Sequence, residues 1–302
     1  MIEMHHLISG LIVASEIPLS GVVEAEKTAR EPDVNVRRGH VPLSLTGSPN
    51  SGANWSISGD KFLFSVPRVA RMLVNSGREI VVESEGSEAD AIPFLLGTAF
   101  GVLLHQRKSL VLHASAVSYE GKGIALCGPS GSGKSSLATA LCRDGGSFVC
   151  DDVAAIHFDI EGTPLVQPDS RQHRLWADVI ERLALSERRG EPVRANIKKY
   201  HVEPESKALP TPLSTIVFVR IAEFNGQAAA LELSSLADAA ALLLRNVYRA
   251  GLTRLMGGDA HLFGQAAHLL GRTRVLRLTR PREPERMEET VALLRDHLFG
   301  IH

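Results

Sequence analysis

The feature that most constrains the fold is a glycine-rich segment, GPSGSGKS at 128–135, which stands between two apolar runs. The run before it, GIALCG at 123–128, predicts a buried strand. The leucine spacing after it predicts a helix that begins at Lys134 and ends at Gly145. SFVCDD at 147–152 then predicts a second buried strand that ends in two carboxylates. This strand–loop–helix–strand order is typical of a parallel or mixed α/β sheet.

The glycine-rich segment matches the pattern GxxxxGK[ST] at every position. Glycines let successive backbone N–H groups turn inward to form an anion-binding concavity, and the helix N-terminus adds partial positive charge. Lys134 would place its charge at the terminal phosphates of ATP, and the Ser135 hydroxyl would coordinate Mg²⁺. The predicted nucleotide-binding residues are Gly128, Ser130, Gly131, Ser132, Gly133, Lys134, Ser135 and Ser136. The alternative is a glycine-rich turn that binds nothing.

Two adjacent carboxylates, Asp151 and Asp152, follow Lys134 by 17 and 18 residues. An enzyme with this loop needs a carboxylate at a neighbouring strand end to hold Mg²⁺, and a kinase also needs a base for the acceptor hydroxyl. Adjacent residues of a strand point to opposite faces, so the two acids share one task only if the backbone turns there. The simplest division gives Asp151 to the metal, together with Ser135, and Asp152 to the acceptor. The alternative is a solvated pair in a turn.

A third candidate is His113, in the run VLHASAV. This run and the one at 123–128 predict a hairpin, because the residues Glu120–Gly123 supply two glycines for a tight reversal. The hairpin would bring His113 near the glycine-rich segment. The alternative is a core histidine with satisfied hydrogen bonds, and position alone does not decide between them.

The elements expected in residues 1–107 differ from those expected in the rest of the chain, and this difference predicts a small N-terminal domain. Short strands are expected at 61–66 and 78–84, with an amphipathic helix at 67–77 between them. The apolar run at 91–105 predicts a buried helix, too short to span a bilayer, and a domain junction follows it.

Residues 108–302 predict the second domain. Beyond the two carboxylates, strands are expected at 214–221 and 273–279, and helices at 234–251 and 283–299. The proline-rich stretch 160–213 predicts no particular structure.

Composition narrows the function classes. The chain has 302 residues with 33 basic and 34 acidic side chains, which argues against a nucleic-acid partner because the phosphate backbone demands basic excess. Three cysteines without a CxxC pair and an N-terminus without a basic leader predict a reduced, cytoplasmic location. No membrane partner is expected, and the sequence leaves a homo-oligomer open.

Taken together, His113, the loop and the Asp-Asp strand end resemble the catalytic domain of HPr kinase/phosphorylase. His113 precedes Lys134 by 21 residues and Asp152 follows it by 18, which is the order and approximate spacing in that family. The resemblance implies a P-loop α/β domain of HPr-kinase-like (phosphoenolpyruvate-carboxykinase-like) fold, beside a smaller, largely β N-terminal domain. It also implies that Asp152 is the catalytic base, that His113 modulates it, that Lys134 acts on the phosphates, and that Asp151 helps to hold Mg²⁺.

The resemblance covers about residues 105–160, and the chain departs from the family beyond them. The stretch QPDSRQHRLWADVIERL at 167–183 holds no glycine-rich motif with a metal-binding glutamate. LLHQRKSLVLHASAV together with RLW looks more like divergent HPr-kinase-like proteins found beside peptide natural-product genes, including lasso-peptide kinases. Reverse phosphorylase activity therefore stays open.

The function expected from these residues is Mg²⁺-ATP-dependent transfer of a phosphoryl group to a hydroxyl, with a serine of a peptide or small protein as the acceptor. The alternatives are a small-molecule kinase, an ATP-binding regulator without turnover, and a carboxykinase-like enzyme whose substrate-binding arginines cannot be located. Basic residues that could neutralise the transferred group are Arg174, Lys198, Lys199, Arg245 and Arg249. The last two are expected to share one helix face.

Overall fold

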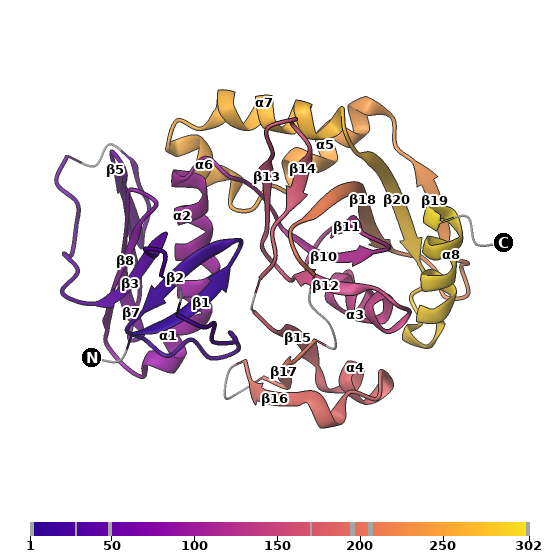
Figure 1. The fold of residues 1–302 in the computed structure, drawn as a ribbon, viewed down its shortest axis with the longest axis horizontal. Helices are drawn as coiled ribbons and strands as arrows, with labels where there is room; N and C mark the ends of the chain where they lie inside the picture. Colours follow the sequence, from indigo (N-terminus) through magenta and orange to yellow (C-terminus); the bar gives the residue numbers. More distant parts are fainter. Residues whose placement is uncertain are drawn as a thin grey trace.

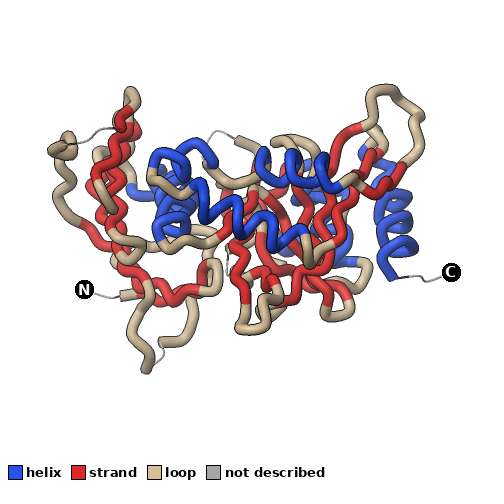
Figure 2. The backbone as a smooth tube through the Cα atoms, turned by 90° about the horizontal axis from the view of Figure 1, so that it is seen from above, coloured by secondary structure: helices blue, strands red, loops and turns tan. Residues whose placement is uncertain are grey.

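The computed structural model describes residues 3–27, 29–47, 50–169, 171–193, 197–204 and 208–299. Within these ranges the chain forms sheets of eight, nine and three strands, with helices packed against them (Figure 1). Seen from above, the strands near the N-terminus and those of the nine-stranded sheet form two groups with helices between them (Figure 2). The expected mixed α/β class is therefore confirmed.

The eight-stranded sheet has the order β1-β2-β3-β8-β7-β6-β5-β4. Its strands are β1 (Met4–Ile8), β2 (Leu11–Ser15), β3 (Val34–Arg38), β4 (Asn50–Ser51), β5 (Trp55–Ser58), β6 (Lys61–Val66), β7 (Ala70–Asn75) and β8 (Glu79–Ser84). Neighbouring strands are antiparallel except for β2 with β3 and β3 with β8, which are parallel. The strands β6 and β8 lie where the sequence predicts them.

The helix expected at 67–77 is wrong, because this segment contains strand β7. Ala70, Met72 and Val74 are buried and alternate with half-buried residues, which is the period of a strand. Leu73 faces the other side of the sheet, in a small cluster with Val41 and Leu63. Apolar residues on both faces of the strand produced the spacing that imitates a helix.

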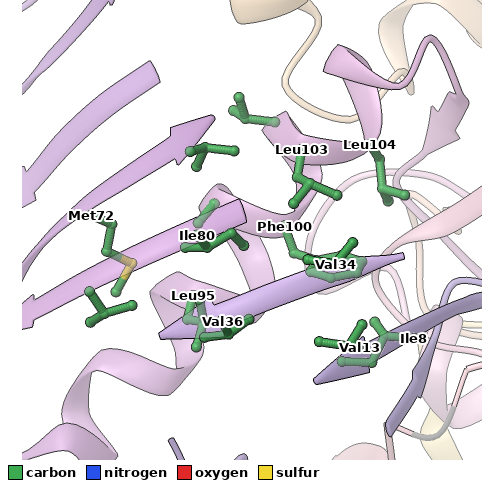
Figure 3. Close-up of a cluster of buried hydrophobic side chains, with 14 of the residues drawn as sticks. Ile8, Val13, Val34, Val36, Met72, Ile80, Leu95, Phe100, Leu103 and Leu104 are labelled. Carbon is green, nitrogen blue, oxygen red and sulfur yellow. The ribbon is translucent and has the colours of Figure 1, made fainter. Parts of the chain in front are cut away.

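The expected buried helix is present and longer than predicted. It runs without a break from Glu88 to Gln106 as α1 (Glu88–Phe94), a π-helical turn η1 (Leu95–Ala99) and α2 (Phe100–Gln106). Leu95, Phe100 and Leu103 pack onto the sheet opposite Val36, Met72 and Ile80 (Figure 3). By length and composition alone these 19 residues could cross a membrane, but 56% of the apolar window is buried inside the structure, as in any core helix.

The nine-stranded sheet has the order β12-β10-β11-β18-β14-β13-β9, and β20 pairs with both β18 and β19. Its strands are β9 (Leu110–Leu112), β10 (Ala114–Tyr119), β11 (Lys122–Cys127), β12 (Ser147–Cys150), β13 (Ala154–Phe158), β14 (Pro164–Val166), β18 (Thr211–Ile221), β19 (Ala230–Leu233) and β20 (Arg274–Arg280). The predicted hairpin is confirmed, since β10 and β11 pair antiparallel on either side of Glu120 and Gly121. Strands β11, β18 and β20 run parallel at the centre. The chain leaves β11, forms α3 (Lys134–Arg143) and returns as β12 on the far side of β10.

Helices cover both faces of this sheet. On one face α3 and α8 (Met287–Phe299) pack through Leu137, Leu141 and Leu294. On the other face lie α5 (Leu236–Arg245) and α7 (Asp259–Leu270), with the short α6 (Ala250–Leu255) between them in sequence. The predicted helix at 234–251 therefore ends early, and the left-handed backbone of Arg249 (φ 52°) separates it from α6. Arg245 and Arg249 consequently do not share a helix face.

The segment that the sequence left unassigned contains the third sheet, with strand order β15-β17-β16. Its elements are β15 (His173–Trp176), α4 (Ala177–Arg182), the 3₁₀ turns η2 (Ser186–Arg188), β16 (Arg189–Pro192) and β17 (Lys199–Val202). Antiparallel pairing places Arg174 opposite His201 and Trp176 opposite Lys199 on one face. A further 3₁₀ turn, η3 (Pro284–Arg286), leads into α8.

A buried ion pair joins the first sheet to the rest of the molecule. The Arg171 guanidinium bonds Asp169, with Nε 2.8 Å from the carboxylate, and also donates to Ser9 Oγ and to the Leu96 carbonyl. The Asp169 side chain is 0% exposed and that of Arg171 9%. The pair thus fastens both the β1–β2 turn and the π-helical turn to the segment that leads into β15. The expected division of the chain into domains at residue 107 stays a prediction.

We expect Asp169→Asn to lower the free energy of unfolding by about 3–5 kcal/mol, because it leaves the buried Arg171 charge uncompensated. The matched control is Asp178→Asn, which removes an exposed pair with Arg182 one helical turn away and should cost less than about 1 kcal/mol. Urea unfolding of the two variants and the wild type measures both values. Equal losses in the two variants would show that the buried pair does not clamp the two parts.

Candidate functional site

The glycine loop, residues Gly128–Ser135, joins the end of β11 to the start of α3. Gly128, Gly131 and Gly133 have φ of 143°, 83° and 89°, which side chains on L-residues rarely allow. A Cβ on Gly128 would lie 2.4 Å from the Val219 carbonyl oxygen, so only glycine lets the loop leave the sheet beside β18. The backbone therefore adopts the curled path that the sequence pattern predicts.

Lys134 lies inside this curl. Its Nζ donates to the carbonyls of Gly128 (2.9 Å) and Pro129 (3.1 Å), and the side chain is almost fully buried. Burial lowers the pKa of Lys134, while the nearby carboxylates of Asp151 and Asp152 oppose that shift. The lysine is thus held by two carbonyls of its own loop. A phosphate bound in the loop would compete with these carbonyls for the N–H groups of Nζ.

Asp151 faces the glycine loop. Its Oδ1 accepts hydrogen bonds from Ser135 (2.9 Å) and Ser115 (2.5 Å), and the backbone N–H of Arg174 lies 3.4 Å from Oδ2. The residue is only 3% exposed. Two hydroxyls and one backbone N–H thus hold this buried carboxylate beside the Ser135 hydroxyl.

Asp152 has other partners, and the backbone turns at this residue, so the alternation of a strand does not set the direction of its side chain. Strand β12 ends at Cys150, and Asp152 has φ of 74°, in the left-handed region. Its Oδ2 lies 2.5 Å from Nη2 of Arg174, and its Oδ1 lies 3.3 Å from Nδ1 of His113. Burial alone would raise the pKa of Asp152, but the Arg174 guanidinium and His113 outweigh burial and hold the pKa at about 2. The two acids are thus separated, as the simplest division requires.

His113 connects Asp152 to Lys134. Its Nδ1 is 3.1 Å from the Asp152 carbonyl oxygen, and its Nε2 is 3.2 Å from Lys134 Nζ. A single neutral tautomer satisfies both partners, with Nδ1–H donating to Asp152 and Nε2 accepting from the lysine. The histidine is therefore neither an isolated core residue nor distant from the loop.

Three residues of the site carried no usable signal in the sequence. Ser115 belongs to no sequence motif, and only its hydrogen bond to Asp151 in the folded chain reveals its role. Asn246 accepts from the Gly128 N–H through Oδ1 (3.0 Å) and from the His113 N–H through its carbonyl (2.8 Å). Arg280 donates from Nε to the Ser132 carbonyl (2.7 Å), and burial lowers its pKa. Asn246 and Arg280 lie more than 100 residues from the loop, so no local pattern reveals them.

Of the five basic candidates, two lie at the acidic pair. Arg174 contacts Asp152 directly. Lys199 lies close enough for both aspartates to act on its pKa, which burial and then Arg174 lower. Arg249 instead donates to Thr98, and Lys198 and Arg245 are exposed.

The residues present fit a magnesium-bound nucleoside triphosphate. The Ser132 hydroxyl is buried in the loop without a hydrogen-bond partner among the described residues, as expected of a group awaiting a phosphate oxygen. Ser135 and Asp151 bring two oxygens together beside the loop. No cluster of three or more His, Cys, Asp or Glu side chains able to hold a metal occurs in the described parts of the chain. A metal here would therefore rely on phosphate and water oxygens as well, which is typical of Mg²⁺. Ser130 is exposed at the loop and Ser136 is half-buried on α3.

A cavity of about 370 Å³ opens on the other side of Asp152. Asp151, Asp152 and Arg174 line its inner end, and no residue of the glycine loop takes part. The helical run Glu88–Gln106 forms one wall, and the face of the third sheet forms the opposite one. The acidic pair therefore lies between the loop and a separate space large enough for part of a second substrate.

No family model matches the sequence, and no curated protein matches it. Among solved structures the chain is similar to the HPr(Ser) kinase/phosphatase from Coxiella burnetii, at 14% identity and a TM-score of 0.30. The similarity covers 63% of this chain and 92% of that one. A likeness of this size carries no functional argument, so the function is argued from the geometry of the site.

We expect Gly133→Ala to destabilise the protein more than Gly131→Ala does. Both glycines have a left-handed φ, which costs an L-residue about 1–2 kcal/mol. A Cβ on Gly133 would also lie 2.9 Å from the Arg280 guanidinium, whereas a Cβ on Gly131 meets nothing within 4 Å. Urea unfolding measures the difference, and in an Arg280→Ala background the two substitutions should cost the same. Equal costs in the wild-type background would contradict the packing of Arg280 under the loop.

Proposed function

We propose that the chain is an ATP-dependent kinase of the HPr-kinase-like, P-loop type, which transfers the γ-phosphoryl group to a serine hydroxyl of a peptide or small protein. The observation that carries this proposal is the divergence of two adjacent carboxylates. Asp151 accepts from Ser135 at the glycine loop, whereas Asp152 contacts Arg174 and His113, and both acids line the cavity. One acid thus serves the nucleotide side and the other the acceptor side.

In this proposal the glycine loop binds the phosphates through its inward N–H groups, and Lys134 exchanges its two carbonyl partners for phosphate oxygens. Ser135 and Asp151 would hold Mg²⁺, which supplies positive charge to the transferring group. Arg174, on the cavity lining, and Lys199, near both aspartates, add positive charge.

Asp152 orients the acceptor and takes up its proton. The acceptor oxygen forms a bond to the γ-phosphorus while the bond from that phosphorus to the bridging oxygen of ADP breaks, and the hydroxyl proton passes to the Asp152 carboxylate. His113 is a positioning residue in this scheme, because its Nδ1–H fixes Asp152 while its Nε2 faces Lys134. The Arg174 ion pair keeps the carboxylate ionised before the acceptor arrives.

The finer features of the proposal follow from the sequence. The runs LLHQRKSLVLHASAV and RLW favour the divergent branch associated with peptide natural products. The cysteine pattern favours a cytoplasmic location, the balanced charge argues against a nucleic-acid partner, and no membrane partner is expected. A small-molecule kinase would use the same residues, and mass spectrometry of a metabolite mixture after reaction would distinguish it. A regulator without turnover would bind ATP but release no ADP when an acceptor is added.

We expect Asp152→Asn to lower kcat for phosphoryl transfer by about 10²–10⁴-fold, the usual contribution of a positioned base. Affinity for ATP should change little, because Asp152 lies on the cavity side. Labelled-ATP transfer to serine peptides measures the rate, and fluorescence titration measures nucleotide binding. Lys134→Ala is the counterpart and should abolish nucleotide binding. If Asp152→Asn transfers label as fast as the wild type, the assignment of the base fails.

We expect Arg174→Met to move the acidic limb of the kcat/KM profile to higher pH. The guanidinium favours the charged form of Asp152, so its removal lets burial raise the pKa upward from about 2. The pH position of the limb is measured rather than the overall rate, because the loss of the Arg174 charge is also expected to slow transfer. Arg182→Met, an exposed residue of α4, is the control. An unchanged limb would show that Arg174 does not govern the protonation of the base.

A further inference from the structure

The cavity beside Asp152 has one apolar wall and one polar mouth. Ile92, Pro93 and Leu96 of the helical run form the apolar wall. Asp90, in the first turn of α1, and Glu191, on the edge strand β16, also line the cavity, from two different elements, and both are exposed. The cavity therefore offers an apolar surface that leads outward from Asp152 to two carboxylates.

The charges that line the cavity do not cancel. Its two arginines, Arg171 and Arg174, are paired with Asp169 and Asp152 respectively. The remaining basic side chain of the lining, His201, is neutral at neutral pH because burial, Arg174 and Lys199 lower its pKa to about 4. Asp90 and Glu191 have no ion-pair partner within the described parts of the chain.

Two unpaired carboxylates on the lining of one cavity attract a cation placed between them more strongly than either does alone. An acidic ligand would instead meet their repulsion before it reached Asp152.

We propose that this cavity is the acceptor site and that it selects a serine with a lysine or arginine beside it in the peptide. This inference rests on the proposed function and names the substrate class for the same site. The serine hydroxyl would reach Asp152, a neighbouring apolar portion would pack on Pro93 and Leu96, and the cationic side chain would lie between Asp90 and Glu191.

The test uses fluorescent serine peptides that differ only in whether the residues flanking the serine are lysine, alanine or glutamate. We expect the wild type to bind the lysine peptide at least tenfold more tightly than the glutamate peptide, without nucleotide, by fluorescence anisotropy. Asp90→Lys/Glu191→Lys should invert that preference. Glu187→Lys, an exposed acid outside the cavity, is the matched control and should leave the preference intact.

A second variant tests the location independently of charge. Ala89→Trp places a large side chain at an exposed position of the cavity lining, so it should weaken peptide binding tenfold or more while ATP affinity is unchanged. Equal binding of the three peptides, or a preference that survives the double charge reversal, overturns the inference.

The same peptides, incubated with labelled ATP, separate the two proposals. Labelling of all three peptides to the same extent would support the kinase proposal and refute the proposed preference for a basic residue beside the serine. Selective binding without labelling supports the cavity as a basic-peptide site and refutes the kinase. Labelling of small hydroxylated molecules but of no peptide overturns the inference and leaves a small-molecule kinase.

Discussion

The left-handed backbone of Asp152 is the constraint on which the arrangement of the site depends. A residue with a side chain in that conformation costs about 1–2 kcal/mol, and neighbouring contacts must compensate for it. His113 contacts the carbonyl of Asp152, and Arg174 holds its carboxylate. An extended backbone would send two adjacent side chains to opposite faces of the sheet. The turn instead leaves both acids on the lining of the cavity with different partners, which are Ser135 for Asp151 and Arg174 with His113 for Asp152.

The same short segment connects the site to the N-terminal sheet. Asp169 and Arg171 fasten the segment to Ser9 and to the π-helical turn, and three residues later Arg174 reaches Asp152. The helical run against this segment is also one wall of the cavity. A shift of the N-terminal sheet would therefore alter both the shape of the cavity and the position of the arginine beside the proposed base. Residues 1–107, on whose role the sequence is silent, thus contribute one wall of the cavity that we propose as the acceptor site.

Local patterns predicted the centre of the structure well. The glycine loop, the helix that follows it, the hairpin and the long parallel strands each have a signal contained within about ten residues, and each is present. The error at β7 has a physical cause, because Met72 is buried on one face of the sheet and Leu73 packs half-buried on the other, and periodicity alone cannot separate this from a helix. Asn246 and Arg280 could not be found, because their roles depend on contacts between segments more than 100 residues apart. Arg174 could be named as a candidate but not chosen over Arg245, since only the fold of the third sheet brings it to Asp152.

The low basicity of Asp152 is compatible with its proposed task. Phosphoryl transfer passes through a loose transition state, in which the acceptor oxygen carries little extra charge until bonding to phosphorus is well advanced. A base that acts under these conditions must above all be ionised and correctly placed. A pKa of about 2 keeps Asp152 ionised at any physiological pH. His113 and Arg174 fix the position of the carboxylate, because each contacts one of its two oxygens. When an acceptor proton reaches the carboxylate, the Arg174 pair weakens and its guanidinium becomes free to face the departing negative charge. The ion pair that suppresses basicity in the resting site can in this way contribute a cation at the moment of transfer.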